Sequence, residues 1–384
     1  MTERPMRILH ALGSLDPGGV EMWLLNVLRH IDRDQFQFDF CTFGSQPGLH
    51  AGEAEKLGSK ILRCPKGSNP WEFGRRFRRI LREGGYDVVH SHVHFFSGTI
   101  LRWASAEGVP VRIAHSHNSH DGRADTLGRG VYRRLMKSWI DRYATHGLAA
   151  SQVAAAQLFG EDWQNDDRWR VLYYGVDPDQ FKKPVDRDAI REELGIPADA
   201  AVVGHVGRFD EQKNHTFLVE IARVTSRERR NVRFLLIGDG PLRHDIEARC
   251  KQLGISGGIH FMGIRKDVPR LMTAMDVFIF PSLWEGLPVA LVEAQAAGLN
   301  CVASDAISPE AALSPESVEF LPLSAGSARW AAEAIRMLAE PKKRSSLLTM
   351  PSNSKFRIQE SVRDLAHVYR SNPASSAEIV EQHV

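Results

Sequence analysis

Short apolar runs alternate with longer amphipathic segments along most of the chain. The first run, MRILHAL, is followed by a glycine-rich turn and by VEMWLLNVLRHI, which has apolar residues at helical spacing. Short, continuously apolar runs predict strands that are buried on both faces, and the segments between them predict the helices that cover those faces. The pattern therefore predicts an α/β protein with parallel sheets.

The alternation is interrupted by a charged, proline-containing stretch at residues 182–200 and then restarts with AVVGHVG. A chain of 384 residues is too long for one ordinary core. We therefore expect two Rossmann-like domains, residues 1–181 and 182–355, followed by an amphipathic helix at 356–371. The polar tail, residues 372–384, is expected to be loosely ordered.

The bulk composition argues against several classes of protein. The formal net charge of +2 gives no sign of nucleic-acid binding. The four cysteines form no C-x-x-C pair, so neither a zinc knuckle nor a disulfide framework is indicated, and we expect a cytoplasmic location. No apolar run reaches the roughly 18 residues that span a bilayer, and the N-terminal segment lacks the apolar core of a signal peptide.

Two glutamates flank a predicted helix start in the motif PSLWEGLPVALVEAQAAG. Pro288 suits the first turn of a helix, which places Glu285 in the loop before it and Glu293 in its second turn. Free N–H groups at a helix start bind phosphate, and the flanking carboxylates would accept hydrogen bonds from sugar or ribose hydroxyls. Alternatively, Glu293 is a solvated helix residue and Glu285 a carboxylate favoured by the helix dipole.

The first strand of each expected domain ends in a motif that would face a ligand. In GHVGRFDEQKNH the strand leads to Arg208 and Lys213, a pair of cations suited to a diphosphate. Alternatively, each is a surface cation, which is the commoner fate of a single arginine or lysine. The G-x-x-G spacing there lacks the third glycine of a dinucleotide fingerprint. In DPGGVE, Gly18 and Gly19 permit close backbone approach to a ligand, or serve only the turn.

Histidines cluster in HSHVH (90–94) and in VRIAHSHNSHDG (111–122). His90, His92 and His94 would alternate onto one face of an extended segment, as in metallohydrolases. A metal-dependent hydrolase is therefore one open interpretation, and ordinary residues at strand ends are another. We expect His115 to be structural and to point away from the face that carries His117.

Several motifs in this order resemble the retaining glycosyltransferases of family 4, which have the GT-B fold and an E-x7-E signature. The motifs are GGVE, GHVGRFDEQKNH, IGDG and DVFIFPSLWEGLPVALVEAQAAGLNCVASD. The chain is similar in particular to the branch that builds capsular polysaccharides and exopolysaccharides, which shares GGVE.W..N..R and RIAHSHN. The resemblance covers about residues 7 to 370.

This resemblance implies two facing Rossmann-like domains, with the acceptor on the N-terminal one and a UDP- or GDP-sugar on the C-terminal one. It also implies that the last helix crosses back to the N-terminal domain. Transfer would retain the anomeric configuration and need no obligatory metal or other cofactor. A sugar-nucleotide sensor without turnover and an epimerase on the same architecture remain alternatives.

Carried over by residue, the resemblance assigns the diphosphate to Arg208 and Lys213 and the ribose to Glu293. Glu285 would contact the transferred sugar, and His117 would point at it from the other domain. The other expected donor contacts are Gly18, Gly19, Gly207, Gly263, Ile264, Gly286, Leu287 and Pro288. The expected acceptor contacts are His92, His120 and Asp121.

Two basic amphipathic segments lie in the expected acceptor domain. FGRRFRRILREGG carries five arginines, with Trp71 and Phe73 nearby, and GRGVYRRLMKSWIDRY adds a second stretch that contains Trp139. Such faces suit an anionic membrane surface that presents a lipid-linked acceptor. A solvated basic helix face explains the same pattern.

Overall fold

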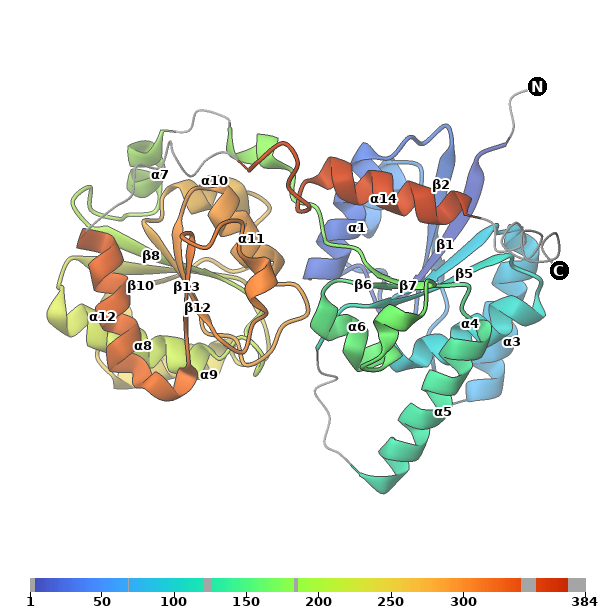
Figure 1. Cartoon of the computed structure of the whole chain (residues 1–384). Helices are drawn as coiled ribbons and strands as arrows, with labels where there is room; N and C mark the ends of the chain where they lie inside the picture. The colour runs from blue at the N-terminus through green and yellow to red at the C-terminus, as the bar shows by residue number, and fades with distance from the viewer. Residues whose placement is uncertain (1–3, 68, 120–125, 183–185, 340–349, 372–384) are drawn as a thin grey trace. The chain divides into compact units, whose positions relative to one another are not determined.

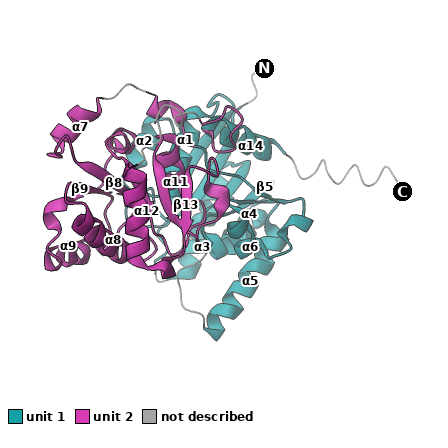
Figure 2. Ribbon diagram, turned by 60° about the vertical axis from the view of Figure 1, so that its left-hand side comes forward, with its two compact units in different colours: residues 1–175, 358–384 teal, residues 176–357 magenta. Residues whose placement is uncertain are grey.

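The computed structural model describes residues 4–67, 69–119, 126–182, 186–339 and 350–371. The chain forms two compact units, which are coloured separately in Figure 2. Unit 1 comprises Met1–Gly175 and Ile358–Val384, and unit 2 comprises Val176–Arg357. The sequence places this boundary near Phe181, but Phe181 is buried in the short helix η3 (Pro178–Phe181), which contacts helix α10 (Val268–Thr273) of unit 2.

Unit 1 is built on a seven-stranded sheet in the order β3-β2-β1-β4-β5-β6-β7, in which every neighbouring pair is parallel. Its strands are β1 (Met6–Leu12), β2 (Phe36–Thr42), β3 (Ile61–Arg63), β4 (Val88–Ser91), β5 (Val111–Ser116), β6 (His146–Ala149) and β7 (Trp169–Val171). Its helices are α1 (Gly19–His30), α2 (Ala51–Lys56), α3 (Pro70–Gly84), α4 (Ser97–Ala106), α5 (Leu127–Tyr143), α6 (Gln152–Phe159) and α14 (Ile358–Arg370).

The two faces of this sheet have different chemistry because side chains alternate along each strand. Leu9, Val89 and Ala114 point to one face and join a hydrophobic core with α3, α4 and α5. His10, on the other face, packs against aromatic side chains of β2 and α14. Helix α14 belongs to this face, where Trp23 of α1 donates to the Ser361 hydroxyl at 2.8 Å.

Unit 2 contains a six-stranded parallel sheet in the order β10-β9-β8-β11-β12-β13. Its strands are β8 (Ala201–Val206), β9 (Val232–Ile237), β10 (Ile259–Phe261), β11 (Val277–Phe280), β12 (Asn300–Ser304) and β13 (Val318–Leu321). Its other helices are α7 (Arg187–Glu193), α8 (His215–Glu228), α9 (Arg243–Gln252), α11 (Val289–Ala296) and α12 (Gly326–Ala339). Trp330 of α12 is fully buried in the core of this unit.

The two sheets confirm the α/β prediction and have the same internal plan (Figure 1). In each unit the strand order reverses beside the first strand, between β1 and β4 and between β8 and β11. Ligands of open α/β sheets bind at the carboxyl ends of the strands at such a reversal. Ligand-binding residues are therefore expected at these two places. Among the described residues, none of the helices is both long and apolar enough to cross a bilayer.

Candidate active site

In unit 2, two motifs that are distant in sequence meet at the point of strand reversal. β8 leads into the loop that holds Gly207, Arg208 and Lys213, and the adjacent strand β11 leads into the loop that holds Glu285. Neighbouring parallel strands end at the same edge of a sheet. Local folding of unit 2 alone therefore brings these side chains together.

Lys213 and Glu285 form a largely buried ion pair. Nζ of Lys213 lies 2.6 Å from Oε1 of Glu285, and the side chains are only 17% and 6% exposed. The same Nζ lies 4.8 Å from the centre of the Phe280 ring. Removing either partner would leave the other charge buried without compensation.

Gln212, which the sequence did not single out, fixes the loop that carries Glu285. Its side-chain amide donates to the backbone oxygen of Trp284 at 2.9 Å and to Oε2 of Glu285 at 3.2 Å. Its backbone oxygen accepts from the N–H of Leu283 at 2.8 Å. The only signal in the sequence was its position next to Lys213.

The start of α11 offers unpaired backbone donors. Pro288 is the capping residue, one position before the first turn in which the sequence places it, because its ψ of 83° is not helical. Gly286 and Leu287 are buried, and no described group accepts a hydrogen bond from their N–H groups. The first turn contains no acidic residue, so its partial positive charge is available to an anion.

Glu293 lies one turn into α11 and is largely buried. Burial raises its pKa to about 7. No described residue donates a hydrogen bond to this side chain or forms an ion pair with it. A carboxyl group held this way has its full capacity to accept hydrogen bonds from a ligand.

Arg208 is exposed at the end of β8, and within the described part of the chain its guanidinium has no partner. The residue before it must be small, because a Cβ on Gly207 would lie 2.9 Å from Nε2 of His205 and 3.1 Å from Cγ of Lys213. Gly207 therefore leaves room for the Lys213 side chain to pass. Arg208 is a cation free to bind an anion at this edge.

The loops after β9 and β10 meet at the same edge. The N–H of Gly238 donates to the backbone oxygen of Gly263 at 2.9 Å, and Gly263 has a left-handed φ of 66° that favours glycine. A Cβ on Gly238 would lie 2.0 Å from the backbone oxygen of Gly207, so the loop after β9 also contacts the end of β8. Ile264 follows with half of its surface exposed.

In unit 1, Gly18 and Gly19 lie at the start of α1. Gly18 is the N-cap residue of α1, and its backbone has an extended conformation that any residue can adopt. As a glycine it has no side chain that could cap the helix. A Cβ on Gly18 would lie 2.3 Å from the carboxylate of Glu21, a flexible side chain that could move. The first turn of α1 thus carries an acidic side chain, Glu21, beside Gly18, and the glycine pair is compatible with both interpretations of the motif.

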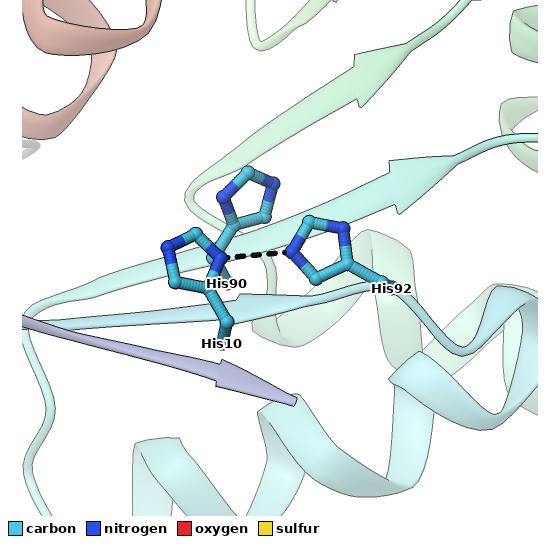
Figure 3. A group of neighbouring side chains, drawn as sticks. All are labelled: His10, His90 and His92. Carbon is cyan, nitrogen blue, oxygen red and sulfur yellow. Dashed lines mark hydrogen bonds between the residues drawn. The ribbon is translucent and has the colours of Figure 1, made fainter. Parts of the chain in front are cut away.

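The carboxyl ends of β1, β4 and β5 carry a group of five histidines on one face, which we call the histidine cluster. Its members are His10, His90, His92, His115 and His117. His10 Nδ1 lies 3.0 Å from His92 Nε2 (Figure 3), and His92 Nδ1 lies 2.9 Å from His117 Nε2. His90 Nε2 lies 3.0 Å from His115 Nδ1.

Two tyrosines close the histidine cluster at its ends. The Tyr369 hydroxyl of α14 lies 2.9 Å from His90 Nδ1, and the Tyr174 hydroxyl forms a hydrogen bond with His117 Nδ1. Burial lowers the pKa of His10 to about 3 and that of every other member well below the ordinary value, and repulsion among the rings adds to the effect. The rings are therefore neutral at pH 7.

Two expectations about these histidines are wrong. His115 points to the same face as His117, with ring centres 4.2 Å apart, because residues two apart in a strand share a face. His94 does not continue the alternation, since it has a φ of 51° and opens a short 3-10 helix. His120 and Asp121 lie outside the described residues.

The sequence missed His10, Tyr174 and Tyr369. Each lies far along the chain from the histidine-rich motifs, and only strand order and the return of α14 bring them together. The sequence predicts which side chains of β1 share a face with His10. It does not predict the register between β1 and β4, which pairs His10 with His90.

The basic helices differ from each other. In α3, Arg76 pairs with Glu72, while Arg78 and Arg82 share Glu107. Phe73 was expected on the exposed face but is buried in the core. In α5, an exposed apolar stripe runs along the helix at four-residue spacing: Leu127, Val131 and Leu135.

Comparisons with known proteins cover both units. Residues 17–180 match the family model described as Glycosyltransferase Family 4, and residues 186–348 match Glycosyl transferases group 1. The chain is 36% identical to the putative glycosyltransferase EpsF of Bacillus subtilis (strain 168), over 96% of this chain and 97% of EpsF. It is 28% identical to the UDP-Gal:alpha-D-GlcNAc-diphosphoundecaprenol alpha-1,3-galactosyltransferase of Escherichia coli, over 59% of this chain and 60% of that enzyme.

The crystal structure of Anabaena Alr3699/HepE in complex with UDP and glucose has a similar fold. Its TM-score is 0.76 at 20% identity, with 95% of this chain and 100% of that chain covered. The likeness to EpsF extends over nearly the whole length of both chains, and two family models account for both units. The chain therefore belongs to the family 4 glycosyltransferases with the GT-B fold.

Proposed function

We propose that this glycosyltransferase moves a hexose from a UDP- or GDP-sugar to a glycan or lipid-linked glycan precursor of an exported polysaccharide, with retention of configuration. One observation carries the proposal. The buried Lys213–Glu285 pair lies at the strand reversal of unit 2, where Arg208 and the N–H groups at the start of α11 have no partner in the described part of the chain. Cations and helix-start amides in one place suit a diphosphate.

The other groups at this edge suit the rest of a sugar nucleotide. Glu293 can accept hydrogen bonds from both ribose hydroxyls, and Glu285 keeps lone pairs for hydroxyls of the transferred sugar. Gly263 and Ile264 would line the base, and an exposed apolar side chain such as Ile264 suits an aromatic ring. Gly18 and Gly19, which have no side chains, would let the backbone come close to the phosphates.

In the proposed reaction, the bond between the anomeric carbon and the diphosphate oxygen breaks, and the acceptor oxygen bonds to the same carbon from the same face. The departing diphosphate takes the proton of the acceptor hydroxyl. Arg208, Lys213 and the amides of Gly286 and Leu287 would stabilise the negative charge that grows on the leaving group. These groups suffice without an obligatory metal or other cofactor.

On the acceptor side, His117 and His92 remain proposed contacts. Both ring nitrogens of His117 are engaged inside unit 1, so a contact with the sugar would replace the bond from Nδ1 to Tyr174. The exposed stripe of α5, with Arg134 beside it, supports a peripheral contact with an anionic membrane that presents the acceptor. The relative from Escherichia coli is named for a diphosphoundecaprenol-linked substrate, which supports a lipid-linked acceptor.

A panel of nucleotides and nucleotide sugars tests the proposal. We expect UDP or GDP to raise the melting temperature, and one nucleotide sugar to be consumed with release of its diphosphate when an acceptor extract is added. Donor binding without consumption would favour a sensor, and conversion of the donor without acceptor would favour an epimerase. Failure of every nucleotide to bind would overturn the proposal.

A further inference from the structure

The histidine cluster contains a nitrogen that the transfer reaction does not use. Nε2 of His115 is fully buried and has no hydrogen-bond partner among the described residues, although Nδ1 of the same ring is held by His90. A buried polar atom without a partner costs free energy unless a ligand satisfies it. The question is which ligand fits.

His115 lies among other imidazoles that could ligate a metal ion. His92, His115 and His117 each offer one nitrogen, and these nitrogens lie within 4.8 Å of one another. In a tetrahedral zinc site with bonds of about 2.0–2.1 Å, neighbouring ligand nitrogens are about 3.3 Å apart. The 2.9 Å between His92 Nδ1 and His117 Nε2 needs to open only slightly to admit an ion.

The surrounding hydrogen bonds fit an ion bound in this way. A ligating imidazole donates its other N–H to a fixed acceptor, which sets its tautomer. With Nδ1 of His92 on the metal, its Nε2–H would point at His10, and with Nε2 of His117 on the metal, its Nδ1–H would point at Tyr174. With Nε2 of His115 on the metal, its Nδ1–H would donate to His90, whose own Nδ1–H would donate to Tyr369.

A second possible set, His10, His90 and His92, fits less well. If Nε2 of His90 bound the ion, Nδ1 of His115 would lose its partner while Nε2 of the same ring stayed unpaired. The set of His92, His115 and His117 satisfies the unpaired nitrogen of His115 and leaves each ligand with an outer partner.

We propose that His92, His115 and His117 bind a divalent transition-metal ion, Zn²⁺ foremost, in unit 1. Neutral imidazoles without a carboxylate suit Zn²⁺, Cu²⁺ and Ni²⁺ rather than Mg²⁺ or Ca²⁺. Three protein ligands leave one position for water or an anion, and His92, which is partly exposed, provides the route from solvent. The ion links β4 and β5 at their carboxyl ends and takes no part in the bond changes of transfer. Because it occupies Nδ1 of His92 and Nε2 of His117, it replaces the substrate contacts proposed above for these two rings.

Cobalt binding to the full-length protein tests this site. After treatment with a chelator, we expect the chain to bind one Co²⁺ with the visible absorption of tetrahedral coordination, and Zn²⁺ to displace it. X-ray absorption of the zinc form should report three imidazoles and one oxygen, a measurement that needs no variant. Absence of Co²⁺ binding, or a spectrum of purely octahedral Co²⁺, would overturn the proposal.

Variants separate the two possible sets. His117→Gln and His115→Gln should abolish the tetrahedral spectrum, whereas His10→Gln, an outer partner, should weaken binding by about tenfold and keep the spectrum. His244→Gln, whose side chain is 93% exposed on α9, is the matched control and should change nothing. Loss of the spectrum in His10→Gln with its retention in His117→Gln would refute the assignment. Circular dichroism verifies that each variant is folded.

Discussion

The two units share one plan and use its carboxyl edge in opposite ways. In unit 1, the side chains at the strand reversal are neutral rings that bond to one another and to two tyrosines. In unit 2, the corresponding edge carries charge, and among the described residues neither Arg208 nor Glu293 has a side-chain partner. The same topology thus produces a cluster of mutually bonded neutral rings in one unit and, among the described residues, a charged edge with unpartnered groups in the other.

This difference shows that the position of a site and its chemistry have separate origins. Strand order determines where ligand-facing groups can lie in both units. Which groups remain available depends on single residues, such as the lysine that pairs with Glu285, whereas Glu293 has no such partner among the described residues. Among substitutions at the two edges, we expect the largest effect at the buried ion pair.

Lys213→Ala should nearly abolish sugar transfer and also destabilise the protein. The change removes a cation proposed to hold the diphosphate and leaves the Glu285 carboxylate buried without its partner, which costs about 3–5 kcal/mol. Activity assays and chemical denaturation measure the two effects. Lys251→Ala, on the exposed surface of α9, is the control, and wild-type activity in Lys213→Ala would remove Lys213 from the site.

Glu293→Gln should weaken nucleotide binding by about tenfold or more at pH 8, because a hydrogen bond to a charged acceptor contributes about 1.5–3 kcal/mol. The raised pKa of about 7 means that the wild-type carboxyl is largely protonated at pH 6 and ionised at pH 8. Wild-type affinity for UDP should therefore rise with pH across this range relative to the variant. A constant ratio of the two affinities from pH 6 to pH 8 would contradict the role of the carboxylate.

Arg208→Gln should reduce nucleotide affinity by about tenfold without lowering the melting temperature, because the guanidinium has no described partner to lose. Calorimetric titration and a thermal melt measure the two quantities. A clear fall in stability with unchanged affinity would mean that Arg208 supports the fold instead.

Tyr369→Phe should have the smallest effect. It removes the hydroxyl that bonds to His90 and should lower the free energy of unfolding by about 1 kcal/mol, the ordinary contribution of one hydrogen bond. Nucleotide affinity should stay at the wild-type value, since the change affects the histidine cluster of unit 1 and not the edge of unit 2. Weaker UDP binding in this variant would show that the two edges are not independent.

Much of the fold was predictable, because buried parallel strands and amphipathic helices have distinct patterns. MRILHAL, for example, was predicted as a strand and has the same bounds as β1. The residues that meet at the edge of unit 2 could be named from the sequence because two compact motifs carry them. The histidine cluster was not, since it depends on the register between β1 and β4 and on the return of α14, which no local pattern encodes. Gln212 was missed because its role depends on a contact with a loop distant in sequence.

Hydrogen exchange with and without UDP tests the central contrast most directly, because it reports on both edges in one experiment. We predict that UDP slows exchange in peptides covering residues 207–214 and 284–293 of unit 2, and leaves residues 88–92 and 111–117 of unit 1 unchanged. Protection confined to the ends of β4 and β5, with none in the two loops of unit 2, would contradict the account.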